Sequence, residues 1–299
     1  MNRRQFITTT ATSAAALALG GSLPGAESKE PNPFELVPLG KTGIKTSRIC
    51  LGTGMRGGNR QSNQTRLGKD GFDALVKAAW ERGVRVFDSA DLYGSMPHLA
   101  DALKEYPRDQ YVIFTKIWVR PGSLPERERP DADVVIDRFR KELKSDYIDL
   151  VLIHCMESAT WTDDYKKQMD IMAGLKNKGI IKAHGVSVHT LAAMKLCVDS
   201  PWVDSVHVRI NHRGASMDNR DPQAVVPVIK QLHDAGKGVV GMKLIGEGRF
   251  TNEADRIQSI DFVHGLGTVD IMNVGFEKLE QIDEFAKHLK EAMSKKASG

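Results

Sequence analysis

Apolar and polar positions follow two alternating spacings along most of the chain. Short continuous apolar runs, such as Val84–Asp88 and Ile148–His154, are typical of strands that are buried on both faces. Between these runs apolar residues recur every three or four positions, as in Phe72–Arg82, which is typical of helices with one buried face. The pattern predicts strands at Arg48–Gly52, Val84–Asp88, Tyr111–Lys116, Ile148–His154, Ile181–Ser187, Ser205–Ile210, Gly238–Leu244 and Val269–Val274, and helices at Phe72–Arg82, Met96–Glu105, Ala132–Leu143, Asp164–Lys178, Leu191–Asp199, Pro222–Ala235, Glu253–Phe262 and Lys278–Met293.

This alternation of strands and helices predicts one large α/β domain over residues 34–293. Eight such units in about 250 residues are typical of a (β/α)8 TIM barrel. An open doubly wound sheet is the alternative, but no G-x-G-x-x-G motif follows the first strand. Ahead of that strand, the segments Phe34–Gly40 and Gly43–Ser47 flank Lys41 and Thr42, which predicts a short β-hairpin. We expect this hairpin to cap the floor of the barrel.

Composition and charge exclude several other classes of protein. Hydrophobic residues make up 41% of the 299 residues and charged residues 27%, which supports a buried core and excludes a disordered chain or a polytopic membrane protein. The net charge is +4 with basic and acidic residues interleaved, so no nucleic-acid partner is expected. Cys50, Cys155 and Cys197 lack C-x-x-C spacing, which excludes a four-thiolate zinc site and an iron–sulfur cluster. We expect three buried free thiols.

The first 26 residues have the organisation of an export signal. Arg3 and Arg4 are followed by an apolar run from Ala11 to Leu19 and then by small residues up to Ala26. A charged start, an apolar run too short to span a membrane and a small-residue cleavage zone follow in the expected order. The segment resembles a twin-arginine export signal, with residues 27–33 as a linker. The alternative is an N-terminal helix that merely begins with two arginines.

This resemblance implies that the twin-arginine export machinery is a partner of the chain. The expected location is the periplasm, or the cytoplasm if the signal is inefficient. After processing, no stable insertion into the membrane is expected, because the apolar run is part of the removed segment.

Reactive side chains stand at the expected carboxyl ends of three successive strands. The second strand ends at Asp88, the third at Lys116 and the fourth at His154. Each shares a strand face with apolar residues two and four positions earlier, which would fill the barrel beneath it. Active sites of such barrels lie at the carboxyl ends of the strands. Tyr93 follows Asp88 by five residues, close enough for its phenol to turn back over the barrel mouth.

Four separated motifs carry a resemblance to a known family. They are Phe87–Gly94, Thr115–Trp118, Asp149–His154 and Gly185–Ser187. In this order and at these strand ends they resemble the aldo-keto reductase superfamily. The resemblance implies a bacterial oxidoreductase that interconverts a carbonyl, in an aldehyde, ketone or sugar, and an alcohol by hydride transfer with a nicotinamide cofactor. It places Asp88, Tyr93, Lys116 and His154 in the catalytic tetrad, with Tyr93 as the proton donor.

The chemistry of these four side chains agrees with that role. A phenol is a poor acid at neutral pH and a neighbouring ammonium stabilises the phenolate, so Lys116 is expected to lower the pKa of Tyr93. Asp88 would keep Lys116 protonated in a buried site, and His154 would hydrogen-bond the substrate oxygen. Any one of the four could be structural, but their joint occurrence at successive strand ends favours catalysis.

The resemblance also implies a cofactor, NADP(H) or NAD(H), across the barrel mouth, and no metal. The last strand–helix loop carries Glu277 and Gln281 where relatives that bind the 2′-phosphate often place cations, so the preference between the two cofactors stays open. The positions that match the cofactor site of the family are Gly52, Thr53, Ser187, His207, Asn211, Met242, Lys243, Leu244, Ile245, Gly246, Gly248, Gly275 and Lys278.

The substrate side of the site is less defined. Trp118 matches a substrate-facing aromatic residue of the family, and Trp161, in the loop after the fourth strand, is expected to line the pocket as well. Either indole could instead belong to the core. Residues 294–299 are expected to form only a short tail, which leaves the mouth open and the carbonyl substrate undetermined.

Two alternative functions stay open at this point. A catalytically quiet barrel could bind a nucleotide or a partner, although the complete tetrad speaks against it. A metal-dependent isomerase or hydrolase barrel would need a set of ligands at the strand ends. Near the fifth and sixth strands lie four histidines without an accompanying carboxylate-rich set, namely His184, His189, His207 and His212.

Overall fold

The computed structural model describes residues 30–218 and 220–297. The predicted export signal, residues 1–26, and the first part of the predicted linker lie outside the described residues. The unit that contains the barrel begins at Pro31, within the predicted linker.

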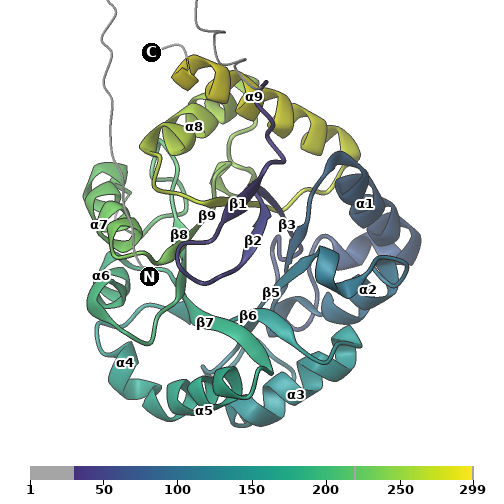
Figure 1. The fold of residues 1–299 in the computed structure, drawn as a ribbon, viewed down its shortest axis with the longest axis vertical. Coiled ribbons are helices and arrows are strands. Elements are labelled where there is room, and N and C mark those ends of the chain that lie inside the picture. Colours follow the sequence, from purple (N-terminus) through teal and green to yellow (C-terminus); the bar gives the residue numbers. More distant parts are fainter. Residues whose placement is uncertain (1–29, 219, 298–299) are drawn as a thin grey trace, which may run out of the picture. The chain divides into compact units, whose positions relative to one another are not determined.

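Eight parallel strands form a closed barrel, which confirms the predicted fold (Figure 1). Neighbours in the sequence are neighbours in the barrel, and the last strand pairs with the first. Each strand is followed by at least one helix, so the helices surround the strands. This sequential order is that of a (β/α)8 barrel. The barrel strands are β3 (Ile49–Gly52), β4 (Val86–Asp88), β5 (Val112–Ile117), β6 (Ile148–Met156), β7 (Ile181–Val188), β8 (Ser205–Arg209), β9 (Gly238–Met242) and β10 (Ile271–Val274).

The helices follow the predicted segments and differ most at two places. The expected helix Asp164–Lys178 is divided, because the backbone of Tyr165 leaves the helical conformation. The last helix continues through residues 294–297, so the predicted tail is wrong there, and Lys295 pairs with Asp261 of the preceding helix at 2.7 Å. The helices are α1 (Gly68–Arg82), α2 (Met96–Ala102), α3 (Ala132–Leu143), α4 (Trp161–Asp164), α5 (Lys166–Asn177), α6 (Leu191–Asp199), α7 (Pro222–Asp234), α8 (Glu253–Leu266) and α9 (Leu279–Ala297).

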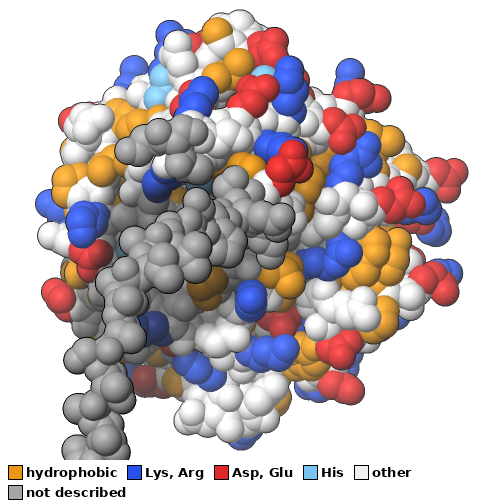
Figure 2. Space-filling view, turned by 45° about the horizontal axis from the view of Figure 1, so that its top comes forward, with side chains coloured by type: hydrophobic (Ala, Val, Ile, Leu, Met, Phe, Trp, Pro, Cys, Tyr) orange, Lys and Arg blue, Asp and Glu red, His pale blue; other side chains and the backbone are white. Residues whose placement is uncertain are grey.

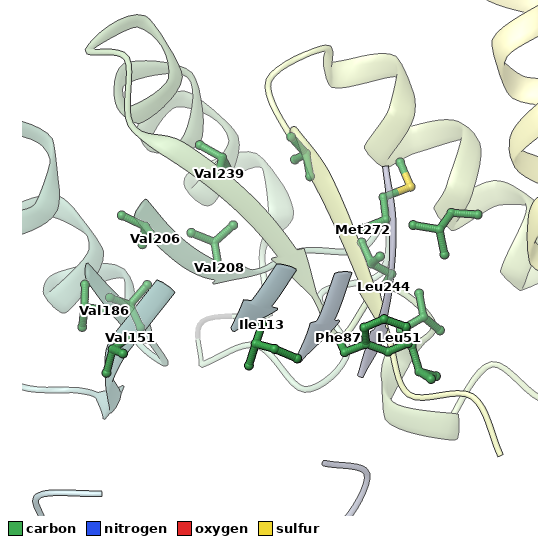
Figure 3. Close-up of a cluster of buried hydrophobic side chains, with 14 of the residues drawn as sticks. Leu51, Phe87, Ile113, Val151, Val186, Val206, Val208, Val239, Leu244 and Met272 are labelled. Atoms are coloured by element: carbon green, nitrogen blue, oxygen red, sulfur yellow. The ribbon is translucent and has the colours of Figure 1, made fainter. Parts of the chain in front are cut away.

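Two apolar layers stabilise the barrel. The outer layer, between strands and helices, includes Leu51, Phe87 and Met272 (Figure 3). The inner layer fills the barrel and includes Val86 and Phe114. Val86 and Phe87 fall in different layers because successive strand residues face opposite sides. Burial of both faces explains why the strands are continuous apolar runs in the sequence.

The predicted hairpin is present and closes the floor of the barrel. Its strands β1 (Leu36–Pro38) and β2 (Lys45–Ser47) pair in antiparallel fashion and lie across the middle of the barrel in Figure 1. Val37, Leu39 and Ile44 of the hairpin are buried and belong to the inner apolar layer. The hairpin therefore completes the core from below.

The contact between hairpin and barrel is close. A Cβ on Gly238, the first residue of β9, would lie 2.5 Å from the Cγ of Leu39. The carboxylate of Asp270 accepts hydrogen bonds from the backbone N–H of Gly40 at 3.1 Å and of Val239 at 2.9 Å. The Asp270 carboxylate and these two backbone N–H groups are thus bonded to each other within the chain.

The described surface has no dominant charge patch on the face shown in Figure 2, where basic and acidic side chains are interspersed. All three cysteines are buried and free, as predicted. Among residues 30–218 and 220–297, no helix is both long and apolar enough to cross a membrane.

Candidate active site

Asp88 and Lys116 form a buried ion pair at the inner end of the barrel mouth. Asp88 ends β4, and Lys116 lies in the adjacent strand β5. The Lys116 Nζ donates to both carboxylate oxygens of Asp88, each at 2.6 Å, and to the backbone oxygen of Ser89 at 2.8 Å. Only 2% of Lys116 and 3% of Asp88 is exposed. Removal of either partner would leave an uncompensated buried charge.

Tyr93 stands beside this pair at the end of a single turn of 3-10 helix, η2 (Asp91–Tyr93). The Lys116 Nζ lies 5.2 Å from the centre of the Tyr93 ring. Two glycines after β3 make room for the phenol: a Cβ on Gly54 would lie 2.2 Å from its ring and a Cβ on Gly57 2.4 Å. Any side chain at Gly54 would have to displace the ring.

His154 reaches the same cluster from β6. Its Nε2 lies 3.4 Å from the Tyr93 hydroxyl, and the two rings meet edge to face with 5.7 Å between their centroids. Trp118 also meets His154 edge to face, at 5.5 Å between centroids, and its Nε1 donates to the backbone oxygen of Gly122 at 2.8 Å. The structure thus brings together the four residues predicted as a tetrad, with Trp118 beside them.

Burial dominates the protonation of this cluster. Burial, followed by the charge of Asp88, raises the pKa of the Tyr93 phenol well above its usual value of 10. The expectation that Lys116 lowers this pKa is wrong, since both oxygens of Asp88 compensate the ammonium charge. Burial, followed by the charge of Lys116, lowers the pKa of His154 well below 6.5. At neutral pH Tyr93 keeps its proton and His154 is uncharged, so the phenol can serve as an acid.

A cleft with a cavity volume of about 90 Å³ opens beside this cluster. Asp88, Tyr93 and Lys116 line its inner end. Gly248 of the short turn η4 (Gly246–Gly248) lies along its side, whereas Gly246, which was also predicted, does not line it. The predicted cofactor residues that line the cleft are Gly52, Met242, Lys243, Leu244, Ile245, Gly248 and Gly275, and the lining residues that the prediction missed are Gly54, Met55, Glu247, Asn273 and Val274.

Four other residues predicted for the cofactor do not line the cleft. The Thr53 Oγ1 donates to the backbone oxygen of Asp88 at 2.8 Å, and the Ser187 Oγ accepts from a backbone N–H of β6 at 2.8 Å. The Asn211 side chain donates to a carbonyl of the β9–α8 loop at 3.1 Å. His207 is fully buried, with its Nδ1 3.7 Å from a carboxylate oxygen of Asp88. These side chains shape the strand ends beneath the cleft.

Trp161 and Lys278 lie away from the cleft. Trp161 begins α4 and is fully buried in the outer apolar layer, where its Nε1 donates to the backbone oxygen of Ala193 at 3.1 Å. The prediction that it lines the substrate pocket is wrong, because α4 begins at this residue and places the indole between helices and strands. Lys278 is exposed, and its backbone N–H donates to the side chain of Gln281 at 3.1 Å.

Two residues that line the cleft but were not predicted from the sequence carry polar side chains. Asn273 interrupts the apolar strand β10 at an inward-facing position, a signal in the sequence that could have identified it. Glu247 is paired with Lys243. Burial opposes ionisation of Glu247, but hydrogen bonds from Lys243 and Ser216 outweigh it, so the pKa of Glu247 lies below its usual value.

Asp91 fixes the turn that carries Tyr93. It is 3% exposed, and its carboxylate accepts from the Arg60 Nε at 3.2 Å and pairs with the Arg138 Nη2 at 2.9 Å. No sequence pattern links these residues, because the two arginines come from separate elements, the β3–α1 loop and α3.

A second cavity of about 340 Å³ adjoins the cleft and shares Ile245 and Gly248 with it. Arg256 lines this cavity, and its Nε donates to Glu284 at 2.6 Å. Together the two spaces form an elongated depression that begins at the buried ion pair.

The four histidines near β7 and β8 do not converge. His184 stacks on Trp202 with 4.4 Å between ring centroids, and His212 lies 3.8 Å from Asp255. Within the part of the chain that the structure describes, no group of three or more His, Cys, Asp or Glu side chains is arranged to hold a metal ion.

Comparison with known proteins decides the family. The model of the aldo/keto reductase family matches residues 48–297, well over half of the chain. The chain belongs to the aldo/keto reductase family. An aldo/keto reductase is by class an oxidoreductase, and the resemblance of the four motifs is thereby confirmed at the level of the family.

Two curated relatives show how far the sequence similarity extends. "Aldo-keto reductase YhdN" of Bacillus subtilis (strain 168) is 30% identical over 171 residues, which are 54% of this chain and 49% of that protein. "NADH-specific methylglyoxal reductase" of Escherichia coli (strain K12) is 29% identical over 222 residues, which are 66% of this chain and 67% of that protein. The match thus spans about half of the first relative and two thirds of the second.

Solved structures of other proteins share the fold. A protein from Pseudomonas aeruginosa has a TM-score of 0.72 at 22% identity, over 89% of this chain and 98% of that chain. The holo form of an aldo-keto reductase from Bacillus halodurans has a TM-score of 0.66 at 17% identity, over 88% and 96% of the two chains. At these identities the likeness shows the fold of this aldo/keto reductase.

The site of this aldo/keto reductase fits a nicotinamide dinucleotide. At the inner end, the Nδ1 of His154 and both ring nitrogens of His207 are buried without a hydrogen-bond partner among the described residues. Such atoms are expected where a polar group of a ligand arrives. In the short turn η4 beside the cleft, Gly246 and Gly248 have positive φ, which lets the backbone approach a ligand closely. The elongated depression would hold the reactive ring near Tyr93.

Proposed function

We propose that this protein interconverts a carbonyl compound and an alcohol with NADPH or NADH, with Tyr93 as the proton donor. The main support is the position of the Tyr93 hydroxyl, 3.4 Å from His154 and next to the buried Lys116–Asp88 pair at the inner end of the cleft. A barrel that only binds a nucleotide would gain nothing from keeping such a charged pair out of water.

Each side chain has a task that follows from its contacts. The cofactor, when bound, supplies the hydride, which no side chain can donate. Tyr93 delivers its proton to the substrate oxygen as negative charge develops there. An alkoxide is a far stronger base than a phenolate, so the raised pKa of Tyr93 does not prevent this transfer. His154 hydrogen-bonds the substrate oxygen, and the Lys116–Asp88 pair holds the inner end of the cleft in place beside the phenol.

Nicotinamide-dependent turnover tests this proposal. The purified protein is mixed with NADPH or NADH and a panel of neutral aldehydes and ketones, and both the loss of nicotinamide absorbance and the alcohol product are measured. We expect turnover that chelators do not affect. A protein that binds the nucleotide in a fluorescence titration but converts none of these carbonyls would instead be the catalytically quiet barrel.

We further predict that NADP(H) is favoured over NAD(H) weakly if at all. Glu277 is held by the Asn63 side chain at 2.9 Å, and Arg256 of the second cavity is already engaged by Glu284. A carboxylate so placed opposes binding of a 2′-phosphate, and a neutralised guanidinium attracts it less. The test compares kcat/KM for the two cofactors. A thousandfold preference for NADP(H), about 4 kcal/mol, would contradict this reading, and Arg256→Gln would then show whether Arg256 supplies it.

From the sequence alone, we propose that the protein is exported by the twin-arginine route and acts in the periplasm. The support is the order of regions within residues 1–26, which lie outside the described residues. Twin-arginine signals serve folded proteins, and free nicotinamide nucleotides are not expected to be plentiful outside the cytoplasm. We therefore expect the cofactor to be loaded before export, held tightly and recycled by alternating oxidation and reduction of two substrates.

Purification from a periplasmic extract tests this pattern of use. Stoichiometric nucleotide that survives dialysis, identified by mass spectrometry, is the expected result. An exported protein that is empty and binds the cofactor at micromolar strength or more weakly, about −8 kcal/mol or less favourable, would contradict it.

A further inference from the structure

Three linked polar side chains at the mouth have no part in the mechanism above. The Sγ of Cys155 lies 3.2 Å from the Nε2 of His189, and the Nδ1 of His189 lies 2.5 Å from the Nη2 of Arg209. Cys155 belongs to a small apolar cluster with Trp118, against which Tyr93 packs. The three side chains therefore begin beside the proton donor and end at a guanidinium.

A bulge in β6 turns Cys155 towards the mouth. The register between β6 and β7 shifts between Ile153 and Met156, and Cys155 has a φ of +61°. In a regular strand Cys155 would face the helices, because the preceding residue, His154, faces the barrel interior. Bulges that re-aim a side chain in this way are common next to active sites.

Arg209 also belongs to the mouth. It ends β8 two positions after His207, so both side chains emerge on the same face of the strand. That face is the barrel interior, since His207 lies 3.7 Å from Asp88. In the neighbouring strand, Arg209 pairs in register with Met242, which lines the cleft. Arg209 thus lies beside a residue of the cleft, and it lines a separate small cavity together with His189 and Asp218.

Donors and acceptors can be assigned for the hydrogen bonds that join Arg209, His189 and Cys155. A guanidinium only donates, so the Nδ1 of His189 accepts from Arg209. Burial, followed by the charges of Arg209 and Lys243, lowers the pKa of His189 to about 2, so its ring is uncharged. The proton of a neutral ring then sits on Nε2 and is directed at the Sγ of Cys155. His189 is a positioning residue that orients the guanidinium.

Arg209 lacks an acidic partner in the described part of the chain. It is half-buried, and its Nε is buried without a hydrogen-bond partner. The acids around it are engaged elsewhere: Glu157 by Arg120 at 2.7 Å, Glu247 by a lysine, and Asp218 by a backbone N–H of α6 at 3.0 Å. A partly buried charge is costly unless an opposite charge balances it.

Resting on the reductase function proposed above, we propose that Arg209 binds a carboxylate of the substrate, so that the enzyme prefers carbonyl compounds that also carry an acid group. A guanidinium presents parallel N–H groups that match the two oxygens of a carboxylate. The Nε–H, which has no partner among the described residues, is one of these groups. Trp118 and Cys155 provide an apolar wall for the body of the substrate.

The test uses pairs of a carboxylic acid and its methyl ester, and it compares the acid-to-ester ratio of kcat/KM between variants. One pair is phenylglyoxylate and its methyl ester, and the other is para-carboxybenzaldehyde and its methyl ester, which place the acid at two distances from the carbonyl. For at least one pair, we expect kcat/KM to be about tenfold or more higher for the acid, the scale of a hydrogen bond to a charged group. Arg209→Gln should bring this ratio close to one, and Arg209→Lys should restore part of it.

Arg120→Gln is the matched control. It removes the same charge near the mouth, but the Arg120 guanidinium is already held by Glu157. Its acid-to-ester ratio should stay within about threefold of the original protein, since a long-range charge at the surface is largely screened. Thermal unfolding and the Kd of NADPH are measured for every variant.

The outcomes separate the two proposals. If the esters are reduced but no acid is preferred, or if Arg120→Gln lowers the ratio as much as Arg209→Gln, the carboxylate site is wrong and the reductase function stands. If Arg209→Gln weakens NADPH binding and leaves the ratio unchanged, Arg209 serves the cofactor and the inference also fails. If neither acids nor esters are reduced, the reductase function itself fails, and the inference falls with it.

Discussion

The two ends of the barrel are built in opposite ways. At the floor, apolar side chains and glycines of the hairpin and the strand starts meet, and the carboxylate of Asp270 accepts two backbone N–H groups. At the mouth, the charges of Asp88 and Lys116 are buried, and ring nitrogens of His154 and His207 have no partner among the described residues. The Asp270 carboxylate at the floor is bonded within the chain, whereas these ring nitrogens at the mouth remain open to a polar group of a ligand.

Backbone conformation shows the same division. Ten non-glycine residues have positive φ in the described part of the chain, and nine of them lie at or beyond the carboxyl end of a barrel strand. The exception is Lys144, which ends helix α3. Each such conformation costs on the order of 1–3 kcal/mol and is typical of functional sites. Strain is therefore concentrated at the end that carries the chemistry, Cys155 and Lys243 included.

The largest expected effect is at the mouth, from Tyr93→Phe. Removal of a general acid costs about two to four orders of magnitude in turnover. The ring still packs against Gly54 and Gly57, so thermal unfolding and nucleotide binding should change little. Steady-state rates with a neutral aldehyde, together with circular dichroism, provide the measurement. Turnover retained in this variant would reject Tyr93 as the proton donor.

At the floor, Leu39→Ala should act on stability and not on chemistry. Leu39 is fully buried in the inner apolar layer, and the loss of such a side chain costs about 2–5 kcal/mol of the free energy of unfolding. Denaturant unfolding measures this change, while kcat of the folded variant should stay within about twofold of the original. A fall in kcat without a loss of stability would show that the two ends are coupled, against the comparison made above.

Gly54→Ala sharpens the comparison by disturbing the mouth without touching a charged group. A Cβ here would overlap the Tyr93 ring at 2.2 Å, so the phenol must move. A displacement of about 1 Å can cost up to a hundredfold in rate, and we expect a loss of about tenfold to a hundredfold in kcat/KM. Gly58→Ala is the matched control, because no atom lies within 4 Å of the added Cβ. Equal losses in both variants would mean that general loop damage, not the contact with Tyr93, sets the rate.

The smallest expected effect is that of pH on reduction. The pKa of Tyr93 is raised above 10, so the phenol stays protonated up to alkaline pH, and the pKa of His154 is lowered below 6.5, so its ring stays uncharged down to acidic pH. Between about pH 7 and pH 9, kcat for the reduction of a neutral aldehyde should therefore change less than about twofold. A decline of tenfold with a midpoint inside this range would show that one of the two groups titrates there.

The fold and the meeting of Asp88, Lys116 and His154 at one end of the barrel could be predicted because both depend on simple periodicity. Strands buried on both faces are continuous apolar runs, and the alternation of side chains within them places Asp88, Lys116 and His154 at the mouth. Other features depend on local geometry that periodicity does not encode. Trp161 is buried because α4 begins where a loop was expected, and the raised pKa of Tyr93 follows from its partial burial beside an ammonium that is already compensated.

Contacts between distant loops were equally beyond prediction. The carboxylate of Asp91 joins Arg60 and Arg138, residues whose spacing in the sequence has no regularity. The group of Cys155, His189 and Arg209 exists only because β6 bulges, and a bulge shifts the register that a prediction from alternation must assume.

The hairpin at the floor also affects how molecules reach the opposite end of the barrel. Because β1 and β2 close one end of the barrel, everything that reaches Asp88 and Lys116 shares a single entrance with everything that leaves. On the proposed function, the cofactor and the substrate would therefore approach from the same side. A hairpin far from the tetrad would thereby fix the direction from which both molecules reach Asp88 and Lys116.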